Sequence, residues 1–160
     1  MLAGVILLGV TGWPLRGAGA EATVGASKAL FKLFGGAEGA ALWHRVGAVL
    51  IIISSIFGRE AGGRMTYNAV KAAEISLGKS LAQQLAKDHI RVNSVSPGYC
   101  RTSLVMKIPE QIRNDIVSSI PVGRLGEPSE IARTVLFLSA DDDGFITGAN
   151  IPVNGGYFMD

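Results

Sequence analysis

The stretch VLIII at positions 49–53 limits the possible folds more than any other part of the sequence. It is a continuous aliphatic run, mostly β-branched, without the polar–apolar alternation that marks a strand with one solvated face. Such runs are typical of strands buried on both faces of a parallel sheet. The run is also far shorter than the roughly 20 residues that a membrane-spanning helix needs. We therefore predict a buried strand over 47–54.

A helix is predicted after this strand and a glycine-rich loop, because residues 65–86 are rich in Ala, Leu, Gln and Lys and contain no proline. The rest of the chain alternates in the same way. Further strands are predicted at 5–12, at 89–98 and within 145–156, and further helices at 18–34, 109–120 and 127–140. Strands that alternate with helices predict an α/β fold with a parallel sheet.

Composition narrows the class of protein. The 160 residues suffice for one domain with a real core, and a hydrophobic share of 48% against 18% charged residues argues against disorder. The net charge is only +2 and the basic residues are scattered, so no nucleic-acid partner is predicted. His44 and His89 have no companion ligand at metal spacing, so we predict no metal site.

The sequence also bears on the cellular compartment. Cys100 is the one cysteine, which excludes an intramolecular disulfide and fits a reducing environment. The apolar run at 5–10 is strand-sized and has no Lys or Arg ahead of it, which argues against both a membrane span and a signal peptide. These features predict a cytoplasmic protein without a membrane partner.

The candidate chemistry lies in the loop and helix that follow the buried strand. Tyr67 and Lys71 are four residues apart, so both lie on one face of the predicted helix. Ser54 and Ser55 end the strand, at the edge of the sheet where ligands bind in open α/β proteins. A nearby ammonium lowers the pKa of a phenol toward the range useful for acid–base work. A serine hydroxyl can hold a carbonyl oxygen while the tyrosine protonates it.

This arrangement lacks a hydride donor, which no side chain supplies, so a reduction would require a nicotinamide cofactor. The alternative reading of Tyr67 and Lys71 is simpler. A Tyr and a Lys four apart on a helix are common by chance and usually lie on a solvated surface. The surrounding motifs are therefore needed to separate the two readings.

Those motifs occur in a recognisable order. They are IISS, YNAVK, RVNSVSPGYCRT, PVGRLGEPSEIA and FITGANIPVNGG. From about Val46 onward, the chain resembles the short-chain dehydrogenase/reductase family. Within that family, the part from SPGYCRT to the end is most similar to acetoacetyl-CoA reductases, and the part around YNAVK is equally similar to 3-oxoacyl-[acyl-carrier-protein] reductases. The resemblance implies a Rossmann-like, doubly wound parallel sheet.

The resemblance also implies catalytic roles. Tyr67 would be the general acid and base, and Lys71 would hold the nicotinamide ribose and lower the pKa of the phenol. The serine that orients the substrate stands before x-x-G in the family, which here indicates Ser55, with Ser54 as the second candidate.

The cofactor-binding residues implied by the family follow the strand at 89–98. Pro97 and Gly98 would shape the wall beside the nicotinamide, and the backbone at Cys100 and the hydroxyl of Thr102 would contact the cofactor. Tyr67 and Lys71 would contribute as well. The expected cofactor is NADP, with NAD possible. Residues 103–120 would form a lid over the substrate, with the isoleucines of this segment facing an acyl chain.

The N-terminal part departs from the family. A dinucleotide fold needs a glycine turn at a helix N-terminus to bind the pyrophosphate, and the family pattern is TGxxxGxG. Residues 11–19 read TGWPLRGAG, which is one residue too long and contains a proline. The segment is either a distorted copy, with Thr11, Gly12, Gly17 and Gly19 as the only candidates for phosphate contacts, or an ordinary loop after an apolar strand.

We therefore predict one incomplete Rossmann-like domain over 1–160, with a divergent part at 1–45 and a catalytic half at 46–160. Two functions follow. The first is NAD(P)H-dependent reduction of a 3-oxoacyl thioester, of the acetoacetyl-CoA or 3-oxoacyl-ACP type, to the 3-hydroxy product. The alternative is a non-catalytic remnant that acts only in oligomerisation or interaction. A homo-oligomer is expected in either case.

Overall fold

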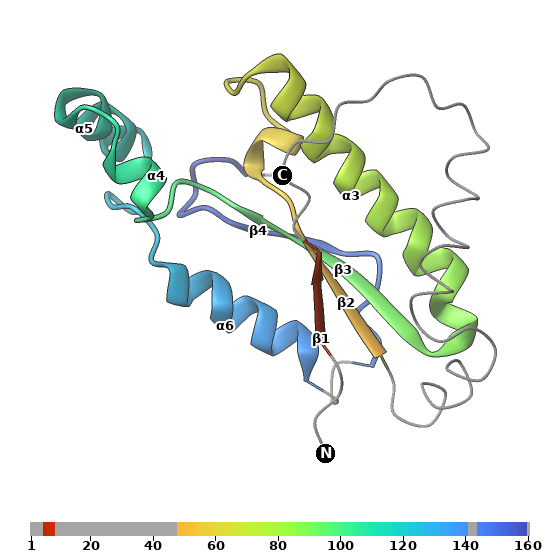
Figure 1. The fold of residues 1–160 in the computed structure, drawn as a ribbon. Coiled ribbons are helices and arrows are strands. Elements are labelled where there is room, and N and C mark those ends of the chain that lie inside the picture. Colours follow the sequence, from red (N-terminus) through yellow and green to blue (C-terminus); the bar gives the residue numbers. More distant parts are fainter. Residues whose placement is uncertain (1–4, 9–47, 141–143, 160) are drawn as a thin grey trace.

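The computed structural model describes residues 5–8, 48–140 and 144–159, which form a parallel sheet covered by helices (Figure 1). The order of the four strands across the sheet is β1-β2-β3-β4. All three strand pairs are parallel. The strands are β1 (Val5–Leu8), β2 (Ala48–Ile53), β3 (Ile90–Pro97) and β4 (Asn150–Val153). The predicted α/β class and parallel sheet are thus confirmed.

The helices among the described residues are η1 (Ile56–Gly58), α3 (Met65–Leu85), η2 (Ala86–Asp88), α4 (Ser103–Met106), α5 (Glu110–Ser119) and α6 (Pro128–Ser139). Helices α3, α5 and α6 lie close to the ranges predicted at 65–86, 109–120 and 127–140, whereas three short helices, η1, η2 and α4, were not predicted. The strand predicted within 145–156 is restricted to four residues, because glycines follow it closely. The helix predicted over 18–34 lies outside the described residues. In the ranges that the structure describes, no helix has the length and apolar character to cross a membrane.

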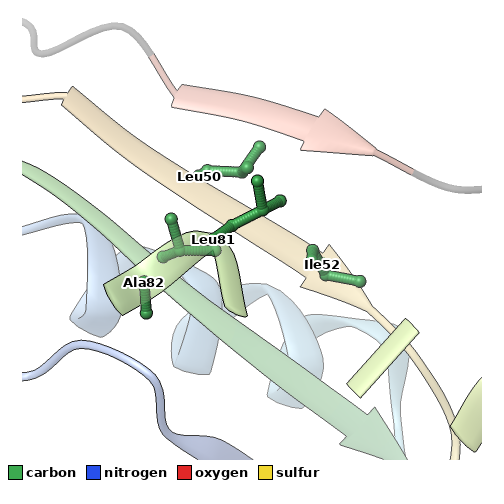
Figure 2. Packing of buried hydrophobic residues seen from close by; sticks show 5 residues of the cluster. Leu50, Ile52, Leu81 and Ala82 are labelled. Atoms are coloured by element: carbon green, nitrogen blue, oxygen red, sulfur yellow. The ribbon is translucent and has the colours of Figure 1, made fainter. Parts of the chain in front are cut away.

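The two faces of β2 explain its uninterrupted aliphatic sequence. Leu50 and Ile52 pack against Leu81 and Ala82 of α3, together with Val92 of β3 (Figure 2). The alternate residues Val49 and Ile51 point to the other face, where they form a second cluster with α6. Since both faces are covered, aliphatic side chains are favoured along the whole length of β2.

The connections between the last three strands place α3 and α6 on opposite sides of the sheet (Figure 1). Both crossovers, β2–α3–β3 and β3–α6–β4, step in the same direction across the sheet. Two crossovers that step the same way but carry their helices on opposite faces must have opposite hands. One of them therefore has the left-handed form, which is rare. The result is a doubly wound sheet, as predicted.

Helix α6 begins at a charged capping arrangement. Glu127 and Glu130 form a capping box, with Pro128 in the first turn of the helix. The Glu130 carboxylate also accepts two hydrogen bonds from Arg124, both 2.8 Å long. The hydrogen bond from Arg124, followed by that from the backbone of Glu127, lowers the pKa of Glu130 from 4.5 to about 2.

This depressed pKa predicts how stability changes in acid. The Glu130 carboxylate is easier to protonate in the unfolded chain, so its contribution is fully present above the ordinary pKa of 4.5 and disappears as the pH falls toward about 2. We expect urea unfolding midpoints to fall more steeply over this window in the wild type than in Glu130→Gln. Glu110→Gln, at an exposed position of α5, is the control and should follow the wild type. Parallel pH profiles for wild type and Glu130→Gln would contradict the prediction.

Candidate active site

Two buried serines end β2 and have different hydrogen-bond partners. The Ser54 hydroxyl donates to the backbone carbonyl of Lys71 at 2.8 Å. The Ser55 hydroxyl oxygen instead accepts from the backbone N–H of Phe57 at 3.2 Å and caps η1. Among the described residues, no acceptor takes the Ser55 hydroxyl proton. Of the two serines, Ser55 is therefore the one whose O–H can be donated to a ligand.

Helix α3 approaches this strand end closely because η1 contains a glycine. A Cβ atom on Gly58 would lie 2.8 Å from both the carbonyl carbon and the carbonyl oxygen of Lys71. Real Cβ atoms do not make such contacts with backbone, so a larger residue would push η1 away from α3. Gly58 thus allows the chain after Ser55 to pack directly on the helix turn that carries Lys71.

Tyr67 and Lys71 lie together on α3, as their spacing predicted. Tyr67 is in the first turns of the helix and is 44% exposed. The Lys71 Nζ atom lies 5.7 Å from the centroid of the Tyr67 ring, within the range of a cation–π contact. The side chain of Lys71 is buried. The alternative interpretation, in which both residues lie on a solvated surface, is therefore wrong for Lys71. The effect of Lys71 on the acidity of the phenol stays a prediction.

The Lys71 ammonium has two protein partners. It donates to the backbone carbonyl of Ile53, at the end of β2, over 3.2 Å. It also contacts both carboxylate oxygens of Glu74, at 2.9 and 3.2 Å. Sequence reasoning missed Glu74, although its position three residues after Lys71 places the two side chains on one helix face.

The residues predicted to bind the cofactor lie where β3 ends. Pro97 is the last residue of β3, and the N–H of Gly98 donates to the carbonyl of Val153 at 3.0 Å. A Cβ atom on Gly98 would lie 2.9 Å from the Cα atom of Asn154, so only glycine allows the chain ends after β3 and β4 to approach this closely. Thr102 caps α4 by accepting from the N–H of Val105.

Cys100 lies in the same segment and is held by its backbone. It forms a parallel bridge with Gly126, and its carbonyl accepts from the N–H of Thr102 at 2.8 Å. Burial, followed by the charges of Glu130 and Glu127, raises the pKa of the Cys100 thiol. A thiol with a raised pKa is a poor nucleophile, so the expectation that only the backbone of Cys100 matters is consistent with its surroundings.

Aromatic rings connect the two groups of candidate residues. The Phe57 ring, just after Ser55, makes edge contacts with Tyr67 on one side and Tyr99 on the other, with centroid distances of 6.4 and 5.9 Å. Tyr99 contacts Tyr157 in turn, at 5.6 Å. The serine–tyrosine–lysine group and the chain after β3 therefore border one region at the carboxyl end of the sheet. Sequence reasoning did not identify this contribution of Phe57, Tyr99 and Tyr157.

The remaining predicted residues are placed only in part. Helices α4 and α5 project beyond the end of the sheet, in the position expected of the segment 103–120 (Figure 1). Ile112 is 52% exposed, but Ile120 is buried, so the isoleucines of this segment do not share one free face. The phosphate-turn candidates Thr11, Gly12, Gly17 and Gly19 lie outside the described residues.

Comparison with known proteins identifies the family. A family model described as Enoyl-(Acyl carrier protein) reductase matches residues 26–158, which is most of the chain. The chain belongs to the short-chain dehydrogenase/reductase family. The match begins upstream of the start at about Val46 that the motifs had indicated.

Individual relatives agree with this assignment. The acetoacetyl-CoA reductase of Rhizobium meliloti (strain 1021) is 49% identical over 112 residues, which cover 69% of this chain and 46% of that protein. The crystal structure of 3-oxoacyl-[acyl-carrier protein] reductase from Brucella melitensis ATCC 23457 matches with a TM-score of 0.73 and 29% identity, over 86% of this chain and 49% of the other. The chain spans about half the length of these dehydrogenase/reductase relatives.

A third relative was solved with a cofactor. The Pseudomonas aeruginosa RhlG/NADP active-site complex matches with a TM-score of 0.65 and 33% identity, over 72% of this chain and 48% of the other. Relatives of this dehydrogenase/reductase chain thus include named oxidoreductases and an NADP complex.

Proposed function

We propose that this dehydrogenase/reductase chain takes part in the reduction of a 3-oxoacyl thioester to the 3-hydroxy product, with NADPH as the preferred cofactor and NADH as the second candidate. The observation that carries the proposal is the placement of Ser55, Tyr67 and Lys71 around the junction of β2 and α3. A donor hydroxyl, a half-exposed phenol and a buried ammonium lie on these consecutive elements, at the sheet edge where α/β proteins bind ligands.

The substrate class is supported by the names of the relatives. The relatives from Rhizobium meliloti and Brucella melitensis are named for acetoacetyl-CoA and for a 3-oxoacyl group on acyl carrier protein. Both substrates carry a ketone two carbons from a thioester. A ketone oxygen is an acceptor of the kind that two hydroxyl donors can hold.

The roles of the residues follow from their contacts. Ser55 would donate its free O–H to the ketone oxygen and so orient the substrate. Tyr67 would transfer its phenol proton to that oxygen as negative charge develops there. Lys71, whose Nζ atom lies 5.7 Å from the centroid of the Tyr67 ring, would stabilise the negative charge that remains there. The phenolate would then regain a proton from solvent.

The site fits the nicotinamide end of a cofactor. Tyr67 and Thr102 are exposed, and among the described residues no acceptor takes the Ser55 hydroxyl proton. Lys71, Thr102, the backbone at Cys100 and the wall formed by Pro97 and Gly98 would hold that end. The cofactor, when bound, supplies the hydride.

The proposal is tested by assaying NADPH-dependent reduction of acetoacetyl-CoA at millimolar NADPH. Formation of 3-hydroxybutyryl-CoA, abolished by Lys71→Met, would support it. A pure, folded chain that forms no product and binds no NADPH would refute it and favour the alternative of a non-catalytic interaction module.

We also propose that the chain associates with copies of itself. The supporting observation is exposed apolar surface: Leu136 and Phe137 of α6 are 72% and 55% exposed, and Leu77 of α3 is 45% exposed. Exposed apolar side chains favour association, because burying them removes apolar area from water. We expect light scattering to give a mass of at least twice that of one chain. A monodisperse monomer at high concentration would contradict this prediction.

A further inference from the structure

The pairing of Lys71 with Glu74 deserves a functional explanation because both side chains are buried. Their exposed fractions are 11% and 8%, and the shorter of their contacts is 2.9 Å. Removing two charges from water costs free energy that their attraction does not always recover. Burial of the Lys71–Glu74 pair is therefore weak evidence that the pair serves only to stabilise the fold. Its position next to a candidate catalytic tyrosine suggests a role in the site.

The contacts of the ammonium account for all of its donors. A lysine ammonium has three N–H groups. Among the described residues, the acceptors around Lys71 are the two carboxylate oxygens of Glu74 and the carbonyl oxygen of Ile53. Three acceptors match three donors. Any ligand that accepts a hydrogen bond from Lys71 must therefore displace one of these contacts.

The geometry also shows which acceptor sets the position of the ammonium. The Ile53 carbonyl belongs to β2 and makes one contact of 3.2 Å, whereas Glu74 makes two contacts, one of them shorter, and carries the opposite charge. Both acceptors face an ionised donor, but only Glu74 adds an opposite full charge, which attracts the ammonium beyond the hydrogen bonds themselves. The carboxylate is thus the stronger of the two restraints on Lys71.

We propose that Glu74 is a positioning residue for Lys71. It holds the ammonium at the carboxyl end of β2, next to the Tyr67 ring, and it competes with a bound ligand for the N–H donors of Lys71. The role of Lys71 toward a nicotinamide ribose rests on the proposed function. The restraint of the Lys71 ammonium by Glu74 is independent of the proposed function.

The test uses NMR signals of the lysine ammonium groups in the ¹⁵N-labelled chain. Lys71 is the one buried lysine among those that the structure describes, so we expect it to give a signal that exchanges slowly with water. The signal is assigned by its loss in Lys71→Met. Glu74→Gln keeps the size of the side chain and one acceptor but removes the charge. We expect Lys71 exchange in this variant to be faster by about tenfold or more, the effect of weakening one charge-assisted hydrogen bond.

Two further variants complete the comparison. Glu74→Leu should remove the slow signal entirely, because only the Ile53 carbonyl would remain as an acceptor. Glu127→Gln removes a carboxylate that pairs with Arg101 instead and should leave the Lys71 signal unchanged. The proposal is wrong if Glu74→Gln and Glu74→Leu keep the chemical shift and exchange rate of the wild type, since the backbone would then hold the ammonium alone.

Titration with NADPH separates this proposal from the proposed function. If the wild type binds NADPH, Glu74→Gln should bind it several-fold more tightly, because Lys71 no longer has to break its contact with a carboxylate. Weaker NADPH binding by Glu74→Gln would contradict the proposed competition between Glu74 and the ligand. Absence of both NADPH binding and product formation at millimolar NADPH would refute the proposed function, whereas the NMR comparison would still decide the restraint by Glu74.

Discussion

Replacing Tyr67 with Phe is expected to lower the rate of NADPH-dependent acetoacetyl-CoA reduction by about 10²–10⁴-fold, the usual contribution of a positioned general acid. The substitution removes only the phenol hydroxyl. The ring contact with Phe57 and the nearby Lys71 ammonium can both remain, so the fold should be unaffected. The rate is measured from NADPH consumption at saturating substrate.

A matched control is available within the same row of aromatic rings. Tyr157→Phe also removes one phenol hydroxyl, but its ring contacts Tyr99 rather than Lys71. We expect this variant to keep most of the wild-type rate. If Tyr67→Phe retained the rate as well, the proton would have to come from another group and the assignment of Tyr67 would be wrong.

The second large effect concerns cofactor affinity. We expect this chain alone to bind NADPH more weakly than a complete dinucleotide site by roughly two to six powers of ten. The only candidates for pyrophosphate contacts are in residues 11–19, which depart from the family pattern by an extra residue and a proline. Two or three charge-assisted hydrogen bonds would be lost, each worth about 1.5–3 kcal/mol.

Calorimetry with NADPH measures this affinity directly. RhlG from Pseudomonas aeruginosa, whose NADP complex is known, provides the reference under the same conditions. A dissociation constant in the micromolar range for this chain would show that residues 11–19 form a working phosphate turn. A millimolar constant would agree with the prediction and would leave the nicotinamide end as the main source of affinity.

The order and type of the strands and of the three longer helices among the described residues could be predicted from local sequence patterns. The run at 49–53 had to be a strand covered on both faces, since no residue in it can face water favourably, and the structure confirms this for β2. The spacing of Tyr67 and Lys71 was equally informative, because a helix brings residues four apart onto one face whatever surrounds it. The predicted bounds of α3 and α6 were correct to within one residue at each end.

Contacts between distant segments depended on the tertiary structure. The family pattern ranked Ser55 above Ser54, but the hydrogen bonds of the two serines depend on the packing of η1 on α3, which gives the proton of Ser54 to the Lys71 carbonyl. The ring contacts that join Phe57 to Tyr99 link residues 42 positions apart. No local periodicity encodes such a pairing.

The ion pair of Glu74 with Lys71 was predictable in part from the local sequence and depended in part on the tertiary structure. The spacing of Glu74 from Lys71 is local and predicts an ion pair, but a pair on a solvated helix would contribute little. The end of β2 and the turn at Gly58 cover this part of α3, so the same pair is buried and all three donors of Lys71 are in use. The sequence alone determined which side chains could meet on one helix face. The packing of the sheet against that face decided which of these side chains are buried. Burial in turn determines how strong each hydrogen bond is and whether its donor is available to a ligand.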